Sequence, residues 1–392
     1  MRNFILYFIL LLLCFVKHNS KIAELPKKLK IGYAFDDRCD SDKIFEAVQN
    51  GLNVVIWFSL DMGASPDGTK PEFKRGPPYD KVAETIKKFK DNHYSVVNLI
   101  SVGGWNYPHP DTRFTAEQYY NEWVEFNKRI TNEALDFYGF DGLDWDLEGN
   151  DDVNSSINYF TFEELNLMGE LSLRLKQGGY YVTMAPPESY LDPSTEEFRL
   201  DLLHNYPEWE TIVPDFAYHG RNAYSYLLAK YSVETFDFIS VQLYEGYSHA
   251  LYKYERQKIP FGDILYELVD NYTKGYYVDF SQEEGSGMGR TLIKIPSERI
   301  VIGLANAWAR DKFVFIEGND IINGYKTLVE KNQDVRGFMY WNIVYEGNKT
   351  AKGEEFYLTK VLNKIFPESE SSWSFRYSVP IFLELLILLF YL

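Results

Sequence analysis

The chain has 392 residues, enough for one large domain or two medium ones, and 45% of them are hydrophobic, which allows a sizeable core. Its formal net charge of −17 argues against nucleic acids and other polyanions as partners, whereas a neutral polymer remains compatible. Aromatic residues make up 17% of the chain; they suit sugar rings but also fill cores, so this count identifies no function.

The N-terminus has the pattern of a secretory signal peptide. Arg2 supplies a positive charge, the apolar run from Ile5 to Val16 is too short to span a bilayer, and polar residues 17–20 follow. We therefore predict a signal peptide over residues 1–20, with a membrane anchor as the alternative. A signal peptide implies a secreted or cell-surface protein.

Secretion sets expectations for cysteine and asparagine chemistry. Cys14 lies in the predicted signal peptide, so Cys39 remains alone and the mature chain forms no internal disulfide. Three triplets are N-glycosylation acceptors if the chain is secreted, and they begin at Asn154, Asn271 and Asn348.

Short apolar runs alternate with helical patterns along the chain. Strands are predicted at Leu29–Ala34, Asn53–Phe58, Val96–Val102, 140–148, Tyr181–Ala185, Phe238–Tyr244, Ile300–Ala305 and Gly337–Trp341. Helices are predicted at Asp42–Gln49, Tyr79–Asp91, Thr115–Phe137, Thr161–Lys176, Asp320–Lys331 and Phe356–Ile365. The long connections after the fifth and sixth strands are interpreted as surface loops, and Thr161 and Glu164 are spaced like a capping box.

Eight strand–helix units predict an α/β fold, a (β/α)8 TIM barrel, over residues 27–367. The alternative is an open doubly wound sheet, but no Gly-x-Gly-x-x-Gly follows the first strand. Only a short connection separates Ala305 from the helix near Asp320, so we expect a single domain without a small inserted α+β domain.

The C-terminus resembles a GPI-attachment signal. An apolar tail runs from Val379 to Leu392 and is interrupted only by Glu384. The small residues of a cleavage site precede a polar spacer, and they are Ser369, Ser371 and Ser372. We predict that residues 368–392 form a GPI-attachment signal, so that a lipid anchor would be the protein's only membrane attachment; a weak membrane anchor or an unprocessed tail are alternatives.

The fourth strand carries three acids on one face. Side chains alternate along a strand, so Asp144, Asp146 and Glu148 point one way while the two leucines and Trp145 between them point the other way. A large tryptophan on the apolar face needs a cover of helices, and this places the acids inside a buried sheet. Because crowded carboxylates cannot all ionise cheaply, at least one should hold its proton near neutral pH, as a general acid must. The alternative is a polar face in water.

The active site of a barrel of this kind lies at the C-terminal ends of its strands. Glu148 would then stand at the mouth, with Asp146 and Asp144 progressively deeper. Side chains of the third, fifth, sixth and eighth strands would converge on them, namely Ser101, Met184, Gln242, Tyr244 and Trp341.

These residues resemble glycoside hydrolase family eighteen, the chitinases and their relatives. The family's Asp-x-x-Asp-x-Asp-x-Glu signature stands here as Asp141, Asp144, Asp146 and Glu148. Its Ser-x-Gly-Gly motif stands at residues 101–104. Its strand-six tyrosine and strand-eight tryptophan match Tyr244 and Trp341, and Tyr33 is similar to a tyrosine on its first strand.

The resemblance implies a retaining glycosidase that acts on β-1,4-linked N-acetylglucosamine without a cofactor, an exception to the two-carboxylate scheme. Glu148 would protonate the glycosidic oxygen while the substrate's own acetamido oxygen attacks the anomeric carbon. Asp146 would bind the acetamido N–H and share the proton of Asp144, which Ser101 and Tyr33 support. The acetamido oxygen would bond Tyr244, and Trp341 would lie beneath the sugar.

One departure concerns strand six, where many relatives have Met-x-Tyr-Asp and this chain has Gln242 to Glu245. The leading interpretation is a monomeric endochitinase that binds chitin or another N-acetylglucosamine-containing glycan. An endo-β-N-acetylglucosaminidase for N-glycans, an inactive chitinase-like lectin and a structural surface protein are the alternatives. The six histidines show no metal-ligand spacing, so we predict no metal site.

Overall fold

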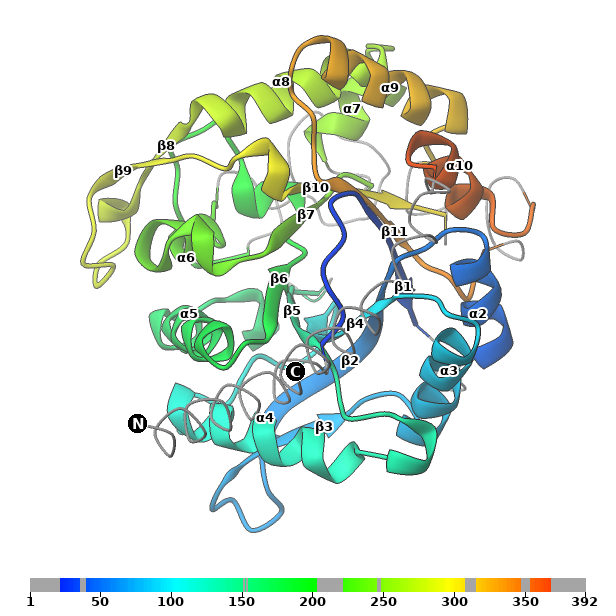
Figure 1. The fold of residues 1–392 in the computed structure, drawn as a ribbon. Coiled ribbons are helices and arrows are strands. Elements are labelled where there is room, and N and C mark those ends of the chain that lie inside the picture. The colour runs from blue at the N-terminus through cyan, green and yellow to red at the C-terminus, as the bar shows by residue number, and fades with distance from the viewer. Residues whose placement is uncertain are drawn as a thin grey trace, which may run out of the picture.

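The fold is a closed barrel of parallel strands surrounded by helices (Figure 1). The computed structural model describes residues 22–35, 40–150, 152, 154–202, 221–244, 248–306, 315–346 and 353–367. The barrel strands are β1 (Leu29–Ala34), β2 (Val54–Ala64), β4 (Val97–Gly104), β5 (Gly142–Leu147), β6 (Tyr181–Met184), β7 (Phe238–Gln242), β10 (Ile300–Ala305) and β11 (Gly337–Trp341). β1 pairs with both β2 and β11, which closes the ring. The predicted (β/α)8 barrel is therefore confirmed, and the open sheet is excluded.

A helix follows every strand of the barrel. These helices are α2 (Ser41–Gln49), α3 (Tyr79–Asp91), α4 (Ala116–Ile130), α5 (Phe162–Gln177), α6 (Ser225–Tyr231), α8 (Phe261–Lys274), α9 (Gly318–Glu330) and α10 (Tyr357–Ile365), with α7 (His249–Glu255) preceding α8. Single 3₁₀ turns lie at Glu133–Leu135, Ser156–Asn158, Glu188–Leu191, Val233–Thr235, Phe280–Gln282 and Ser297–Arg299. The capping box predicted at Thr161 and Glu164 is present at the start of α5.

Two sequence interpretations are corrected. The helix expected to run to Phe137 ends at Ile130, because Thr131 leaves the helical conformation with a ψ of 132°. The connections expected to be surface loops contain α6, α7 and α8. α8 buries Ile264, Leu265, Leu268 and Val269, so its apolar residues belong to the layer around the barrel rather than to a loop.

Two antiparallel pairs extend the ring. β2 continues beyond the predicted Phe58 and pairs with β3 (Pro71–Arg75), which forms a hairpin at the C-terminal end of the barrel. The second pair, β8 (Tyr276–Asp279) with β9 (Arg290–Ile293), lies after α8 and projects to one side of the ring (Figure 1). β10 ends at Ala305 and α9 begins at Gly318, and residues 307–314 between them lie outside the described residues.

Strand alternation divides the core in two. Inward-facing residues such as Ile31, Ile56, Leu99 and Met339 form one apolar cluster inside the ring. Their neighbours along each strand pack outward against the helices in a second, larger cluster. Trp145 belongs to the outer cluster, where it is fully buried and its Nε1 donates to Ser172 Oγ on α5 at 2.9 Å. Its cover of helices is the one predicted from sequence, so the acids beside it face the lumen.

Within the described part of the chain, no helix is both long enough and apolar enough to cross a membrane. The predicted signal peptide, the C-terminal tail, Cys39 and the sequon at Asn348 lie outside the described residues.

Candidate active site

Three acidic side chains line the lumen in a row that rises toward the barrel mouth. Asp144 and Asp146 are on β5, and Glu148 follows its last residue. Their exposed fractions rise from 0% at Asp144 through 4% at Asp146 to 6% at Glu148. The row therefore runs from the closed interior toward the end of the barrel where ligands reach such folds.

Asp144 is the anchored, deep end of the row. Its Oδ2 accepts hydrogen bonds from the Tyr33 hydroxyl at 2.6 Å and from the Ser101 hydroxyl at 3.3 Å, and its Oδ1 accepts one from the Thr183 hydroxyl at 2.5 Å. Ser101 and Thr183 stand beside it because the strand registers pair both with Asp144. Three hydroxyl donors from three strands fix the orientation of this carboxyl group.

Gln242 connects the two acids nearer the mouth. Its side-chain Nε2 lies 2.9 Å from Asp146 Oδ1 and 3.2 Å from Glu148 Oε1, and it donates to the Ala185 carbonyl at 2.6 Å. It reaches them from β7, on the opposite side of β6. The side-chain amide of Gln242 therefore sets the relative position of the Asp146 and Glu148 carboxyl groups.

Burial is the main reason that Asp144 and Glu148 resist ionisation. It raises the pKa of Asp144 to about 6, against the lowering effect of hydrogen bonds from Thr183, Tyr33 and Ser101. It also raises the pKa of Glu148 to about 7, opposed by hydrogen bonds with Gln242 and Asp146. The sequence argument expected a held proton from carboxylates crowded in a poorly hydrated space, and removal from water is the largest cause.

An aromatic wall stands beside the acids at the mouth. The indole of Trp341, at the end of β11, lies 5.0 Å from the ring of Phe58 and 5.7 Å from that of Tyr33, measured between centroids. Phe35 packs 5.1 Å from the same indole. Tyr244 belongs to the same inner cluster and is only 6% exposed. The predicted Tyr33, Tyr244 and Trp341 are thus brought together, and Tyr33 links them to Asp144.

The structure does not bring Met184 to this cluster. Met184 is fully buried in the outer layer, among residues that include Trp145, while its neighbour Thr183 faces Asp144. Side chains alternate along a strand, so only one of two adjacent residues can face the lumen. The prediction that Met184 faces the acids is therefore wrong, and the preceding residue, Thr183, does so instead. Glu245, the departure on strand six, lies outside the described residues.

The first acid of the signature, Asp141, lies at the other end of the barrel. It precedes β5, and its Oδ2 accepts a hydrogen bond from the Asn98 backbone N–H at 2.8 Å. Burial raises its pKa to about 7. Asp141 therefore joins β5 to β4 at the bottom of the ring and has no place in the row at the mouth.

Thr183 and Tyr224 lie near the acids, and the sequence analysis placed neither of them there. Thr183 could have been found by extending the inward register of Asp144 to the fifth predicted strand. Tyr224 could not: it precedes α6, more than seventy residues after the acids, yet its hydroxyl accepts from the Leu147 N–H at 2.8 Å and lies 3.1 Å from the Leu147 carbonyl oxygen. It thereby fixes the backbone immediately before Glu148.

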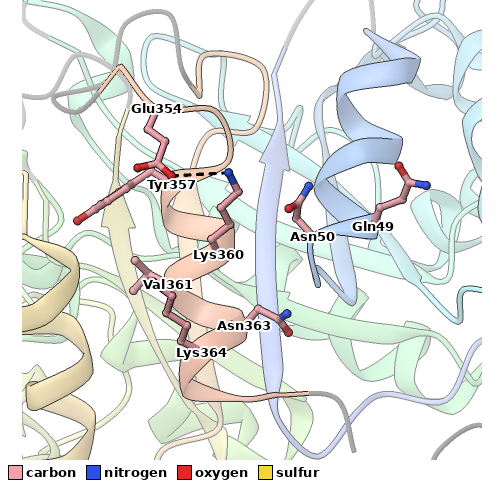
Figure 2. A pocket seen from close by; sticks show the side chains of 8 residues that line it. All are labelled: Gln49, Asn50, Glu354, Tyr357, Lys360, Val361, Asn363 and Lys364. Carbon is pink, nitrogen blue, oxygen red and sulfur yellow. Dashed lines mark ion pairs between the residues drawn. The ribbon is translucent and has the colours of Figure 1, made fainter. Parts of the chain in front are cut away.

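Several hollows of the described surface lie away from the acids. One of about 390 Å³ separates α2 from α10 on the outer surface, where Glu354 and Lys360 form an ion pair at 3.6 Å (Figure 2). None of the predicted site residues lines it. Among the described residues, no group of three or more His, Cys, Asp or Glu side chains is arranged to hold a metal ion.

Comparison with known proteins gives one match by sequence. A protein named chitinase from Enterococcus faecalis is 24% identical over 226 residues, which are 57% of this chain and 54% of that protein. The chain thus matches about half the length of this relative. No family model matches the chain.

Solved structures share the fold. A fungal endo-beta-N-acetylglucosaminidase from glycosyl hydrolase family 18 superposes with a TM-score of 0.53 at 15% identity, over 87% of this chain and 98% of that one. A family GH18 chitinase from Chromobacterium violaceum gives 0.55 at 13% identity, over 89% and 88%. The chitinase ChiC from Aspergillus fumigatus gives 0.51 at 16% identity, over 88% and 96%. At these identities the likeness concerns the barrel itself.

Proposed function

We propose that this chain, which is chitinase-like in fold and in its sequence match, is a retaining glycoside hydrolase that cleaves β-1,4-linked N-acetylglucosamine polymers. One observation carries the proposal: three buried carboxyl groups, graded in depth, rise along β5 to an aromatic wall, and the outermost has a pKa of about 7. An acid with a pKa near the working pH is protonated in a large fraction of the molecules and can still give up its proton in the transition state.

In the proposed mechanism Glu148 is the general acid. It protonates the glycosidic oxygen, and the bond from that oxygen to the anomeric carbon breaks. The carbonyl oxygen of the substrate's own acetamido group bonds to the anomeric carbon on the opposite face, which gives an oxazolinium ion. Glu148, now ionised, then takes a proton from a water molecule whose oxygen bonds to the anomeric carbon. The bond between that carbon and the acetamido oxygen breaks in the same step, which restores the acetamido group, and the configuration is retained.

The neighbouring groups hold the acetamido group during this reaction. Asp146 accepts a hydrogen bond from the acetamido N–H and balances the positive charge of the oxazolinium ion. Asp144, which is anchored by its three hydroxyl donors, shares a proton with Asp146. The Tyr244 hydroxyl donates to the acetamido oxygen. Trp341 forms an apolar floor for the sugar ring, and Gln242 keeps the two outer acids in register. Buried and anchored groups need little rearrangement as charge develops, which is the condition for electrostatic catalysis.

The test is incubation of the purified protein with chitin oligomers, with the products separated by size. We expect release of shorter oligomers whose new reducing ends first appear in the β configuration. A Glu148→Gln variant of equal folding is the matched control, because it keeps the shape of the acid and removes its transferable proton. Absence of cleavage by the parent, or equal cleavage by the variant, would overturn the proposal.

A second candidate is an endo-β-N-acetylglucosaminidase that acts on N-glycans. The solved endo-beta-N-acetylglucosaminidase of fungal origin has this barrel over nearly its whole length. The same acids serve both reactions, and the loops at the mouth select the substrate. Incubation with a high-mannose glycoprotein, followed by mass measurement of the protein, separates the two: release of the glycan leaves one N-acetylglucosamine on each asparagine. An inactive lectin would bind the oligomers and release nothing from either substrate.

We further propose that the protein is a monomer that is secreted or held at the cell surface by a lipid anchor. The support for secretion and for the anchor is the sequence pattern at the two ends of the chain. Asn154 is exposed in a turn, whereas Asn271 is half-buried on α8, so Asn154 is the better glycosylation acceptor. Release from membranes by a phosphatidylinositol-specific phospholipase supports the anchor, and a soluble protein that retains Leu392 refutes it.

A further inference from the structure

The backbone of Glu148 lies just beyond the sheet. The ladder between β4 and β5 ends with Gly104 and Leu147, so no strand pairing holds the residue that follows. Other contacts must therefore keep the carbonyl group and side chain of Glu148 in place.

The loop between β4 and α4 supplies these contacts. The Asn106 N–H donates to the Gly149 carbonyl at 2.9 Å, and the side-chain amides of Asn106 and Asn150 are joined at 2.9 Å. His109 Nε2 lies 3.0 Å from the carbonyl oxygen of Glu148 itself. The loop thus binds three consecutive residues from Glu148 onward, and His109 is the one that contacts the acid.

The imidazole of His109 is fixed on its other sides as well. Its ring stacks on Phe160 with a centroid separation of 4.7 Å and an interplanar angle of 16°. Its Nδ1 lies 3.4 Å from Oε2 of Glu164 without a hydrogen bond between them, and the His109 side chain is only 5% exposed. Glu164 is itself held, because the same Oε2 accepts the Thr161 N–H at 2.7 Å in the capping box of α5. The chain of contacts runs from the start of α5 through His109 to the backbone of Glu148.

We infer that His109 is a positioning residue for Glu148, and that it acts by donating its Nε2 proton to the Glu148 carbonyl. A carbonyl oxygen can only accept, so Nε2 must carry the proton in this geometry. The bond restrains the main chain that carries the acid, in line with the strict geometric demands of proton transfer to a glycosidic oxygen. His109 itself contacts neither the acid's carboxyl group nor the aromatic wall in the described contacts. The inference rests on the proposed function insofar as Glu148 is its acid.

A pair of substitutions distinguishes the two ring nitrogens. The amide nitrogen of His109→Gln can occupy the place of Nε2, whereas that of His109→Asn can occupy only the place of Nδ1. We expect His109→Asn to lower kcat on chitin oligomers by roughly 10- to 100-fold with little change in KM, in keeping with the cost of misplacing a catalytic group by about 1 Å. His109→Gln should restore most of the rate. A kcat equal to the parent's in His109→Asn, or equal losses in both variants, would overturn the inference.

A second measurement does not depend on activity. In protein labelled with ¹⁵N-histidine, His109 should show a protonated Nε2, identified by the loss of its signals in His109→Gln. With ¹³C-labelled glutamate, the titration midpoint of the Glu148 carboxyl group should move toward its ordinary value in His109→Asn and stay in place in His109→Gln. If chitin and glycoprotein are both left intact while these shifts appear, the proposed function fails and the positioning role stands. An unprotonated Nε2, or an unmoved midpoint in His109→Asn, overturns the role itself.

Discussion

The hydroxyl of Tyr33 on β1 donates a hydrogen bond of 2.6 Å to Oδ2 of Asp144 on β5, across the interior of the barrel. Both residues are almost completely buried, at 2% and 0% exposed. Burial and the neighbouring acids raise the pKa of Tyr33 well above its ordinary value, so the phenol stays protonated and remains a donor. The bond ties the deepest acid to the strand opposite and, through the ring contact of Tyr33 with Trp341, to the aromatic wall.

Removal of this bond tests its role directly. Tyr33→Phe keeps the ring and deletes the hydroxyl, so a hydrogen bond to a carboxyl group is lost, worth about 1.5–3 kcal/mol of folding free energy. Since the bond lowers the pKa of Asp144, its loss should raise that pKa further and reduce kcat. Chemical denaturation and oligomer hydrolysis are the measurements. Ser101→Ala, which deletes the longer 3.3 Å bond to the same oxygen, should have the smaller effect, and the reverse order would contradict this account.

The pH dependence of hydrolysis follows from the pKa of Glu148. The reaction requires its acid form, so the rate should fall as pH rises through about 7. Steady-state kcat on chitin oligomers between pH 5 and 9 measures this. A rate that keeps rising through that interval would mean that Glu148 is no general acid.

Loss of the transferable proton of Glu148 should greatly lower kcat. Glu148→Gln is expected to lower kcat by about 10²- to 10⁴-fold, the usual contribution of a general acid, while oligomer binding persists. Isothermal titration with a chitin oligomer, beside the hydrolysis assay, separates the two effects. Lost binding together with lost activity would point to a damaged fold instead.

Asp146 has a different task in the proposed mechanism. Asp146→Asn keeps its size but removes the negative charge that stabilises the oxazolinium ion, so we expect a loss in kcat of about 10²- to 10³-fold. The substitution also replaces the Asp146 carboxyl group that is hydrogen-bonded to Glu148 by an uncharged amide, so the midpoint of the pH–rate profile should move. Turnover near that of the parent would count against assistance by the substrate.

Substitutions at the adjacent residues Thr183 and Met184 on β6 should have very different effects on kcat. Thr183→Val removes the hydroxyl that donates to Asp144 and keeps the side-chain shape, so kcat should fall. Met184→Leu changes a residue of the outer layer and conserves volume, so kcat and KM should stay within about twofold. Both variants are measured on the same oligomers with thermal unfolding as a check. A rise in KM for Met184→Leu alone would restore the sequence-based expectation for Met184.

Buried carboxyl groups also govern stability. Burial raises the pKa of Asp141 and Glu346 to about 7 and that of Glu188 to about 8. A group whose pKa is raised in the folded state contributes its full stability below its unfolded pKa and loses it as pH rises through the folded pKa. The melting temperature should therefore be higher near pH 5 than near pH 8.5.

Glu346→Gln provides the control for this prediction. Glu346 is fully buried and accepts hydrogen bonds from Tyr340 at 2.9 Å, from Leu358 N–H and from Thr359 Oγ1. A glutamine cannot ionise, so the difference between the melting temperatures at the two pH values should shrink. Parent and variant with the same pH dependence would assign the effect to other groups.

The sequence by itself determined the elements with strong periodicity. The strands Leu29–Ala34, Ile300–Ala305 and Gly337–Trp341 have the predicted bounds, because each is a short apolar run between clear turn signals. Alternation around Trp145 also placed Asp144, Asp146 and Glu148 in the lumen, since the period of two leaves each side chain a single choice of face.

Only the tertiary structure decided which residues meet these acids. Thr183 rather than Met184 faces Asp144, because the strand register, and not the identity of a residue, sets the inward face of β6. Tyr224 and His109 reach the backbone around Glu148 from connections whose course no local pattern encodes. Local sequence specifies helix, strand and face, whereas a contact between loops depends on how the whole ring closes and on where each loop is then free to pack.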